Sequence, residues 1–243
     1  MRRPASDSSS WGLLLAALLL AGPLAGCGGL ENGGKTIITT PSAGVFPPNS
    51  SPYGKTYGEW SAVWWQWDLL LPLSRNPAVD PTGQFAGEGQ SGPVWFLAGT
   101  YGGRAERTCT IPTGKGIFFP IVCSGYVCNL PTDTEPVARG CVRNDMNRVT
   151  DLELTVDNVS ITGLESLRCE SLRFDVLFDA DDPLWPVSDP GPYPAYSDGC
   201  WVMLEPLSPG THTIDFRGKL VQPESYPKTD VFETVVTYHL TVQ

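Results

Sequence analysis

Glycine and proline interrupt this sequence so often that few long helices can form. The chain of 243 residues contains 26 glycines and 23 prolines. Glycine inside a helix costs about 1 kcal/mol relative to alanine, and proline costs about 3 kcal/mol. Many turns with few long helices are typical of all-β proteins. We therefore expect a mainly β fold.

One segment does have the signature of a helix, the tryptophan-rich stretch EWSAVWWQWDLLLP at residues 59–72. Thr56 and Glu59 match a capping box, in which each side chain bonds the other residue's backbone N–H at the start of a helix. Pro72 has no N–H to donate and disfavours helical geometry in the residue before it. These signals predict a helix over residues 57–71.

This helix carries two apolar stripes at 100° per residue. The wider stripe, which we expect to pack on a sheet, contains Tyr57, Trp60, Val63, Trp64, Trp67, Leu70 and Leu71. The narrower stripe contains Ala62, Trp65 and Leu69. Because Trp65 lies outside the wider stripe, it is the best candidate for an exposed ring that stacks on a sugar. Glu59 and Gln66 lie between the stripes and complete this candidate site.

Alternation of apolar and polar residues predicts about eight to ten strands in the rest of the chain. The clearest cases are residues 152–161, 172–178 and 211–216, where Thr211, Thr213 and Asp215 alternate with larger core candidates. Residues 124–150 are a polar, cysteine-bearing excursion. We expect a β-sandwich or jelly roll spanning residues 56–243 as one domain, with the helix packed on one face or end.

The N-terminus predicts export and lipid attachment. Residues 1–26 combine two arginines, an apolar run too short to span a bilayer and small residues, which is typical of a signal peptide. The sequence Leu24-Ala25-Gly26-Cys27 resembles a bacterial lipobox, which implies cleavage before Cys27 and diacylation of its thiol. Residues 27–55, rich in Gly, Pro and Ser, are then a flexible tether. We expect a lipid-anchored protein at the outer membrane or cell surface.

Cysteine usage fits the same compartment. Besides Cys27, the chain has an even number of cysteines, which in an exported protein predicts up to three disulfides with undetermined pairing. They are Cys109, Cys123, Cys128, Cys141, Cys169 and Cys200. The short spacings among Cys123, Cys128 and Cys141 favour at least one disulfide between two of these residues.

Charge and motifs narrow the classes of function. The formal net charge of −10 disfavours nucleic acid as a partner. No nucleophile elbow, zinc-protease motif or phosphate loop occurs in the sequence. The alternative function is glycoside hydrolysis, for which Glu59 and Asp80 are the candidate pair of catalytic carboxyl groups. His212, beside a Pro-Gly turn, is either a ligand contact or a strand histidine that pins the turn. Arg104, Arg107 and Lys115 are candidate contacts for an anionic ligand.

The sequence gives only weak support for a metal site, in an acidic segment near residue 180. Asp179, Asp181 and Asp182 offer oxygen ligands of the kind that calcium prefers, but without a complete EF-hand loop. A solvated acidic loop is the favoured interpretation. We therefore expect no cofactor, with calcium as the alternative.

Four blocks of the sequence resemble a family of exported bacterial proteins of unknown function. They are EWSAVWWQW, GQSGPVWFLAGTYGG, RTCTIPTGKGIFFP and SDGCWVMLEPLSPGTHTIDFRG. The resemblance implies an exported β-rich domain and carries no activity. We expect a non-enzymatic, lipid-anchored envelope protein that binds a ligand such as a glycan. A carboxylate-dependent hydrolase and a purely structural envelope protein are the alternatives.

Overall fold

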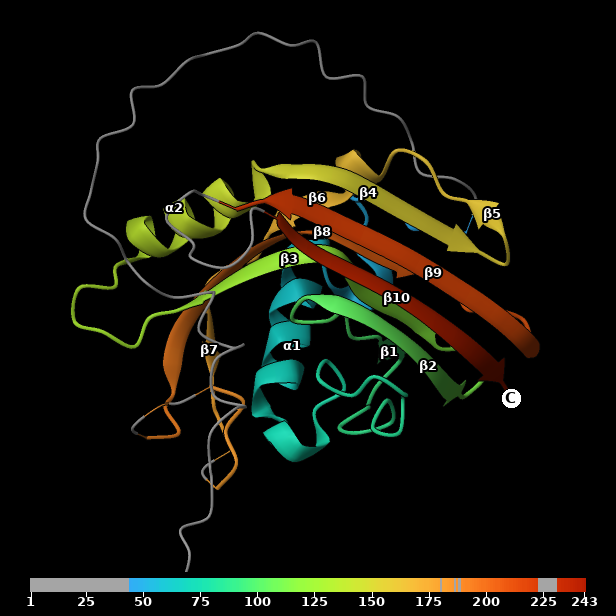
Figure 1. Cartoon of the computed structure of the whole chain (residues 1–243), viewed down its shortest axis with the longest axis horizontal. Helices are drawn as coiled ribbons and strands as arrows, with labels where there is room; N and C mark the ends of the chain where they lie inside the picture. Colours follow the sequence, from blue (N-terminus) through green and yellow to red (C-terminus); the bar gives the residue numbers. More distant parts are fainter. Residues whose placement is uncertain (1–43, 180, 186, 188, 223–230) are drawn as a thin grey trace, which may run out of the picture. The chain divides into compact units, whose positions relative to one another are not determined.

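The computed structural model describes residues 44–179, 181–185, 187, 189–222 and 231–243. Two five-stranded sheets dominate this part of the chain, and a tryptophan-rich helix precedes the strands in the sequence (Figure 1). The predicted mainly β, sandwich-like fold is confirmed.

Sheet A is built around the two long strands β3 and β8, which pair antiparallel along nearly their whole length. Its strands are β1 (Val94–Phe96), β3 (Gly116–Val127), β8 (Tyr193–Leu204), β6 (Arg168–Glu170) and β7 (Phe174–Val176). The short strand β1 runs parallel to β3, while β6 and β7 both pair with β8 on its other side. Nearly every residue of β3 and β8 is buried, so sheet A is the centre of the core.

Sheet B is formed by the C-terminal strands and their partners. Its order is β2 (Gly103–Ile111), β10 (Val231–Val242), β9 (Gly210–Val221), β4 (Val149–Val156) and β5 (Val159–Ser160). The turn at residues 112–115 separates β2 from β3. They do not form a hairpin, because β2 pairs parallel with β10 while β3 belongs to sheet A. The turn therefore carries the chain from one sheet to the other.

The two sheets pack face to face through β3 and β9. The rings of Phe119 and Phe216 lie 5.0 Å apart. At Gly218 the strands come so close that an added Cβ would lie 2.6 Å from Val122 Cβ and 2.7 Å from the Ile121 carbonyl oxygen. The close contact between β3 and β9 at this point thus requires a residue without a side chain, Gly218.

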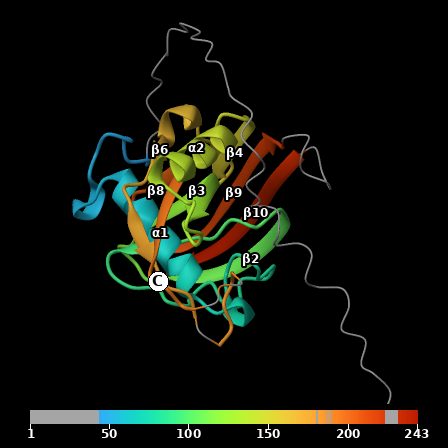
Figure 2. The ribbon, with the colours of Figure 1, turned by 90° about the vertical axis from the view of Figure 1, so that its left-hand side faces the viewer.

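Two helices cover the parts of sheet A that sheet B leaves open (Figures 1 and 2). Helix α1 (Tyr57–Leu70) lies on the face opposite to sheet B, and its capping box between Thr56 and Glu59 forms as predicted. Helix α2 (Glu135–Met146) packs on β3 and β8. Within the described residues, neither helix has the length and apolar character needed to traverse a bilayer.

Helix α2 falls inside the excursion at residues 124–150, where the sequence pattern predicts no helix. Pro136 stands in its first turn and Gly140 lies in its middle, where glycine lowers helix propensity. Its buried side is narrow and consists of Ala138, Val142 and Met146. Tertiary packing of that narrow stripe stabilises the helix, as is usual for short helices.

The domain begins earlier than the predicted boundary at residue 56. Val45 is buried and forms a bridge with Leu204, next to a hydrogen bond from the Phe46 N–H to the Met203 carbonyl. Residues 44–55, expected within the tether, therefore belong to the folded domain.

Arg107 ties the long loop at residues 71–92 to the core. The residue is 1% exposed, and its guanidinium donates to the carbonyl oxygens of Asp80 at 2.7 Å and Ala98 at 2.6 Å. It also donates to the Tyr238 hydroxyl at 2.8 Å. Arg107 is therefore a structural residue, and its suggested role as a contact for an anionic ligand is wrong.

We predict that Gly218→Ala lowers the free energy of unfolding by about 1–3 kcal/mol, because the new methyl group overpacks the contact between the sheets. Gly140→Ala is the matched control, since nothing lies within 4 Å of the position that an added Cβ would take there. Alanine should stabilise that helical site by about 0.5–1 kcal/mol. Urea unfolding of both variants measures the difference, and equal effects would contradict this account of sheet packing.

Candidate functional site

All four tryptophans of α1 are buried. Three of them donate hydrogen bonds to backbone carbonyls: Trp60 to Pro52 at 2.9 Å, Trp64 to Leu97 at 3.0 Å and Trp67 to Glu88 at 2.8 Å. Trp64 also lies edge-on against Trp201 of β8, with ring centroids 5.4 Å apart. The prediction that the wider stripe packs into the core is confirmed for these rings.

Trp65 is buried as well, with 6% of its surface exposed. Its ring lies where β3 has no side chain, since an added Cβ at Gly125 would come within 2.8 Å of Trp65 Cζ2. It also packs edge-on against Trp64 at 5.3 Å. The expectation that Trp65 offers an exposed ring for stacking is therefore wrong, because the narrower stripe of Ala62, Trp65 and Leu69 is buried. In the wider stripe Leu70 is 52% exposed, so its predicted packing on the sheet is wrong.

The neighbours proposed to act with Trp65 are used locally. Glu59 accepts hydrogen bonds from the N–H and the hydroxyl of Thr56, both at 2.8 Å, and these bonds lower the pKa of its carboxyl. Gln66 is exposed, and its amide donates to the Asp175 carbonyl of β7 at 2.8 Å. Gln66 thereby holds an edge strand against the helix.

The carboxylates proposed as a hydrolytic pair serve separate backbone turns. Asp80 accepts hydrogen bonds from the N–H groups of Thr82 at 2.8 Å and Phe85 at 2.9 Å. Glu59 caps α1. These bonds favour the charged form of each carboxyl group and give neither the raised pKa of a general acid.

His212 joins the end of sheet B to two turns. Its Nδ1 lies 2.7 Å from Asp157 Oδ2, and its Nε2 lies 2.8 Å from the Ser208 carbonyl oxygen. Asp157 and Asn158 have φ angles of 51° and 63°, so they form the left-handed two-residue turn between β4 and β5. The arrangement matches a strand histidine that pins turns. The hydrogen bond to Asp157 raises the pKa of the imidazole, and burial opposes the rise.

We predict that the His212 imidazole titrates above 6.5 in the folded chain and that Asp157→Asn lowers its pKa. The stabilisation from protonated His212 is complete at pH values below the unfolded pKa and is lost as pH rises through the folded pKa. An NMR titration of the His212 ring protons measures the pKa of the imidazole in wild type and in the Asp157→Asn variant. Asp151→Asn, on the same sheet, is the control and should leave the titration unchanged. An equal response to both variants would refute the pairing.

The six described cysteines are free thiols in this structure. Cys123 and Cys169 lie directly opposite Gly199 on its two sides, so two strand spacings of about 4.8 Å each separate them. A disulfide needs Cα atoms closer than about 7 Å, so the register excludes this pair without backbone movement. Burial raises the pKa of every described thiol. A disulfide between other cysteines stays a prediction.

The acidic loop forms its own turns. Asp179 Oδ1 accepts hydrogen bonds from the N–H groups of Asp181 at 3.0 Å and Asp182 at 2.9 Å. Asp182 Oδ2 accepts from the N–H of Ser74 at 2.8 Å. Over the described ranges, no group of three or more His, Cys, Asp and Glu side chains is placed to hold a metal ion.

The predicted signal peptide and Cys27 lie outside the described residues.

Asp68 is a fully buried carboxyl group that sequence reasoning did not identify as a site. The Tyr101 hydroxyl donates to its Oδ2 at 2.5 Å, while Oδ1 has no hydrogen-bond partner among the described residues. Burial raises the pKa of Asp68 to about 6, and the Tyr101 hydrogen bond opposes the rise. Asp68 thus joins α1 to the segment that follows β1.

We predict that Asp68 makes the folded state less stable as pH rises from about 4 to about 6. The folded carboxyl keeps its proton over this range while the unfolded one, with a pKa of 3.8, loses it. The penalty is complete above the folded pKa and is on the order of 3 kcal/mol. Asp68→Asn removes this titration, so its stability relative to wild type should increase with pH. Denaturant unfolding at pH 4 and 8 checks this, and a constant difference would contradict it.

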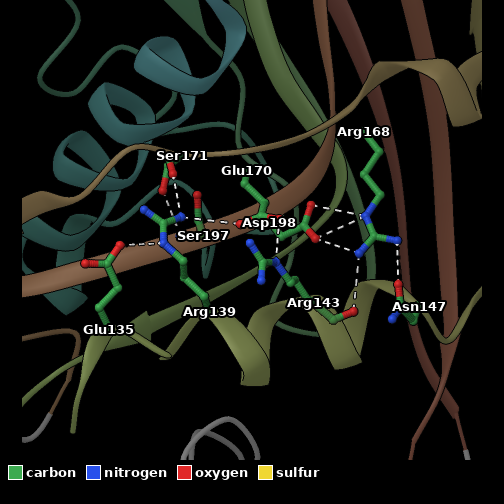
Figure 3. Close-up of polar contacts among 9 residues, drawn as sticks. All are labelled: Glu135, Arg139, Arg143, Asn147, Arg168, Glu170, Ser171, Ser197 and Asp198. Carbon is green, nitrogen blue, oxygen red and sulfur yellow. Dashed lines mark hydrogen bonds and ion pairs between the residues drawn. The ribbon is translucent and has the colours of Figure 1, made fainter. Parts of the chain in front are cut away.

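A network of ion pairs attaches α2 to sheet A (Figure 3). Arg168 Nη2 lies 2.6 Å from Asp198 Oδ2, and the Asp198 side chain is 1% exposed. Glu170 accepts from Arg143 at 2.6 Å and from Arg139 at 3.3 Å. Each of these charges faces an opposite charge, so the network is a structural attachment of the helix.

The outer face of sheet B is the large surface that no described helix covers. Most of its side chains are polar, while the alternate residues Ile214, Phe216 and Leu240 are buried in the core. Asp215 Oδ1 accepts from the Thr237 hydroxyl at 2.6 Å, and its Oδ2 accepts from the Thr155 hydroxyl at 3.3 Å. This open, hydrogen-bonding face is the best candidate for a contact surface in the described part of the chain.

The middle of this face holds a charge cluster around Arg217. Its guanidinium lies 2.7 Å from Glu233, 2.8 Å from Glu153 and 3.2 Å from Asp151. The cluster joins β9 to β10 on one side and to β4 on the other. Three carboxylates thus surround one guanidinium, and the ion pairs link three strands of the sheet.

The chain matches no protein-family model and no curated protein. Among solved structures, it is similar to one described as "Solution Structure of Amebosin". The two are 13% identical, the match covers 58% of this chain and 96% of that chain, and the TM-score is 0.18. So low a TM-score carries no information about function. The resemblance to exported bacterial proteins stays a prediction.

Proposed function

We propose that the chain is an exported, lipid-anchored envelope protein that binds a ligand without catalysis. The lipobox Leu24-Ala25-Gly26-Cys27 supports the anchor. The observation that supports binding is the open outer face of sheet B, because both faces of sheet A are covered while this face presents polar side chains to solvent.

Two features favour binding over hydrolysis. The candidate carboxylates Glu59 and Asp80 each stabilise a backbone turn. His212 is likewise bonded at both ring nitrogens, to Asp157 and to the Ser208 carbonyl. These side chains are occupied by the fold, whereas several exposed hydroxyls of sheet B are not.

We predict that the full-length chain, expressed in a bacterium with radiolabelled palmitate, carries the label and sediments with the membrane fraction. Cys27→Ser should lose the label, because its hydroxyl cannot be acylated by the same route. Cys141→Ser is the matched control and should behave as wild type. Label retained by Cys27→Ser would refute the lipid anchor.

A further inference from the structure

One end of the outer face of sheet B carries a regular array of hydroxyl groups on three adjacent strands. In one row, Thr241 of β10 lies opposite Thr110 of β2 and Thr211 of β9. In the next row, His239 lies opposite Thr108 and Thr213. We call these six residues the threonine array.

The spacing of the array follows from the sheet. Neighbouring strands are about 4.8 Å apart, and rows two residues apart along a strand are about 7 Å apart. Each threonine is β-branched, so its side chain is stiff and presents a hydroxyl and a methyl group in a fixed orientation. The array therefore displays hydroxyl and methyl groups at repeated distances without a large loss of side-chain entropy on binding.

The hydroxyls of the array differ from other threonines of the same sheet. Thr155 and Thr237 both bond Asp215, and Thr234 bonds Thr100 at 2.9 Å. Within the described residues, the five array hydroxyls have no such side-chain partner, and Thr108, Thr110 and Thr211 are exposed. Their hydrogen-bonding capacity is available to a ligand.

The chemistry of the array limits the class of ligand. It contains no Lys or Arg, and the chain as a whole is acidic, which disfavours phosphate backbones and anionic lipid. It lacks the aromatic anchors that usually dominate protein interfaces. Its one titratable group, His239, already bonds Glu106 at 2.9 Å. Neutral hydroxyls and methyl groups match the O–H and C–H groups of a sugar ring.

We propose that the threonine array is the binding site for a neutral glycan. This proposal rests on the proposed function, since it names the ligand class and the residues for binding at the open face. The hydroxyls would exchange hydrogen bonds with sugar hydroxyls, while the methyl groups contact the C–H faces. Contacts of this kind are individually weak, so a polymer that spans several of them is the expected form of the ligand.

The test measures capture of immobilised neutral and acidic polysaccharides by the purified chain. Thr110→Val with Thr241→Val removes two hydroxyls and keeps the β-branched shape, and should raise the apparent Kd for the neutral glycan about tenfold. Thr241→Arg, which places a bulky cation at the centre of the array, should abolish capture. Thr150→Val, an exposed threonine of β4 outside the array, is the control and should bind as wild type. Unchanged melting curves verify that each variant folds.

The remaining outcomes separate the two proposals. If wild type captures a glycan, both array variants bind normally and Glu153→Arg on the same face abolishes capture, the array is refuted while binding at the open face stands. If wild type captures only acidic glycans, the proposed ligand class is wrong. If wild type captures no polysaccharide at all, the array proposal and the proposed glycan-binding function both fail.

Discussion

The close approach of α1 to sheet A is the contact on which the rest of the structure depends. It is made possible by glycines on both elements: Gly125 of β3 leaves room for Trp65, and an added Cβ at Gly58 of α1 would lie 2.6 Å from the Glu170 carbonyl oxygen of β6. Within sheet A, Trp201 stacks on Phe118 at 5.3 Å. Large rings beside missing side chains thus form one packed layer, in which each aromatic removes about 150–250 Å² from water.

This layer also organises the loops around it. Indole N–H groups of α1 bond carbonyls in three separate segments that lack long secondary structure, at Pro52, Glu88 and Leu97. Arg107 supplies a second set of such bonds from the opposite sheet. Buried backbone carbonyls need partners, and these side chains provide them. The four tryptophan rings of α1 are therefore buried in the fold, which leaves the ligand-binding role to a different surface.

That surface is the sheet face that faces neither the core nor a helix. A strand in a two-layer sandwich directs alternate residues outward, so a regular hydroxyl array needs only threonines at every second position. The pairs Thr211 with Thr213 and His239 with Thr241 show this spacing. What the strand pattern does not reveal is that β2 enters the sheet parallel to β10 and aligns Thr108 and Thr110 with them.

The sequence by itself determined the local structure: the helix bounded by its capping box and Pro72, and most of the alternating strands. These depend on backbone chemistry and on a period of two or 3.6 residues, both of which can be read over a short range. Only the tertiary structure decided that Trp65 is buried and that β2 and β3 part at their turn. It also decided that α2 is a helix and that Asp68 is enclosed. These outcomes depend on contacts between residues far apart in the chain, and local pattern does not specify such contacts.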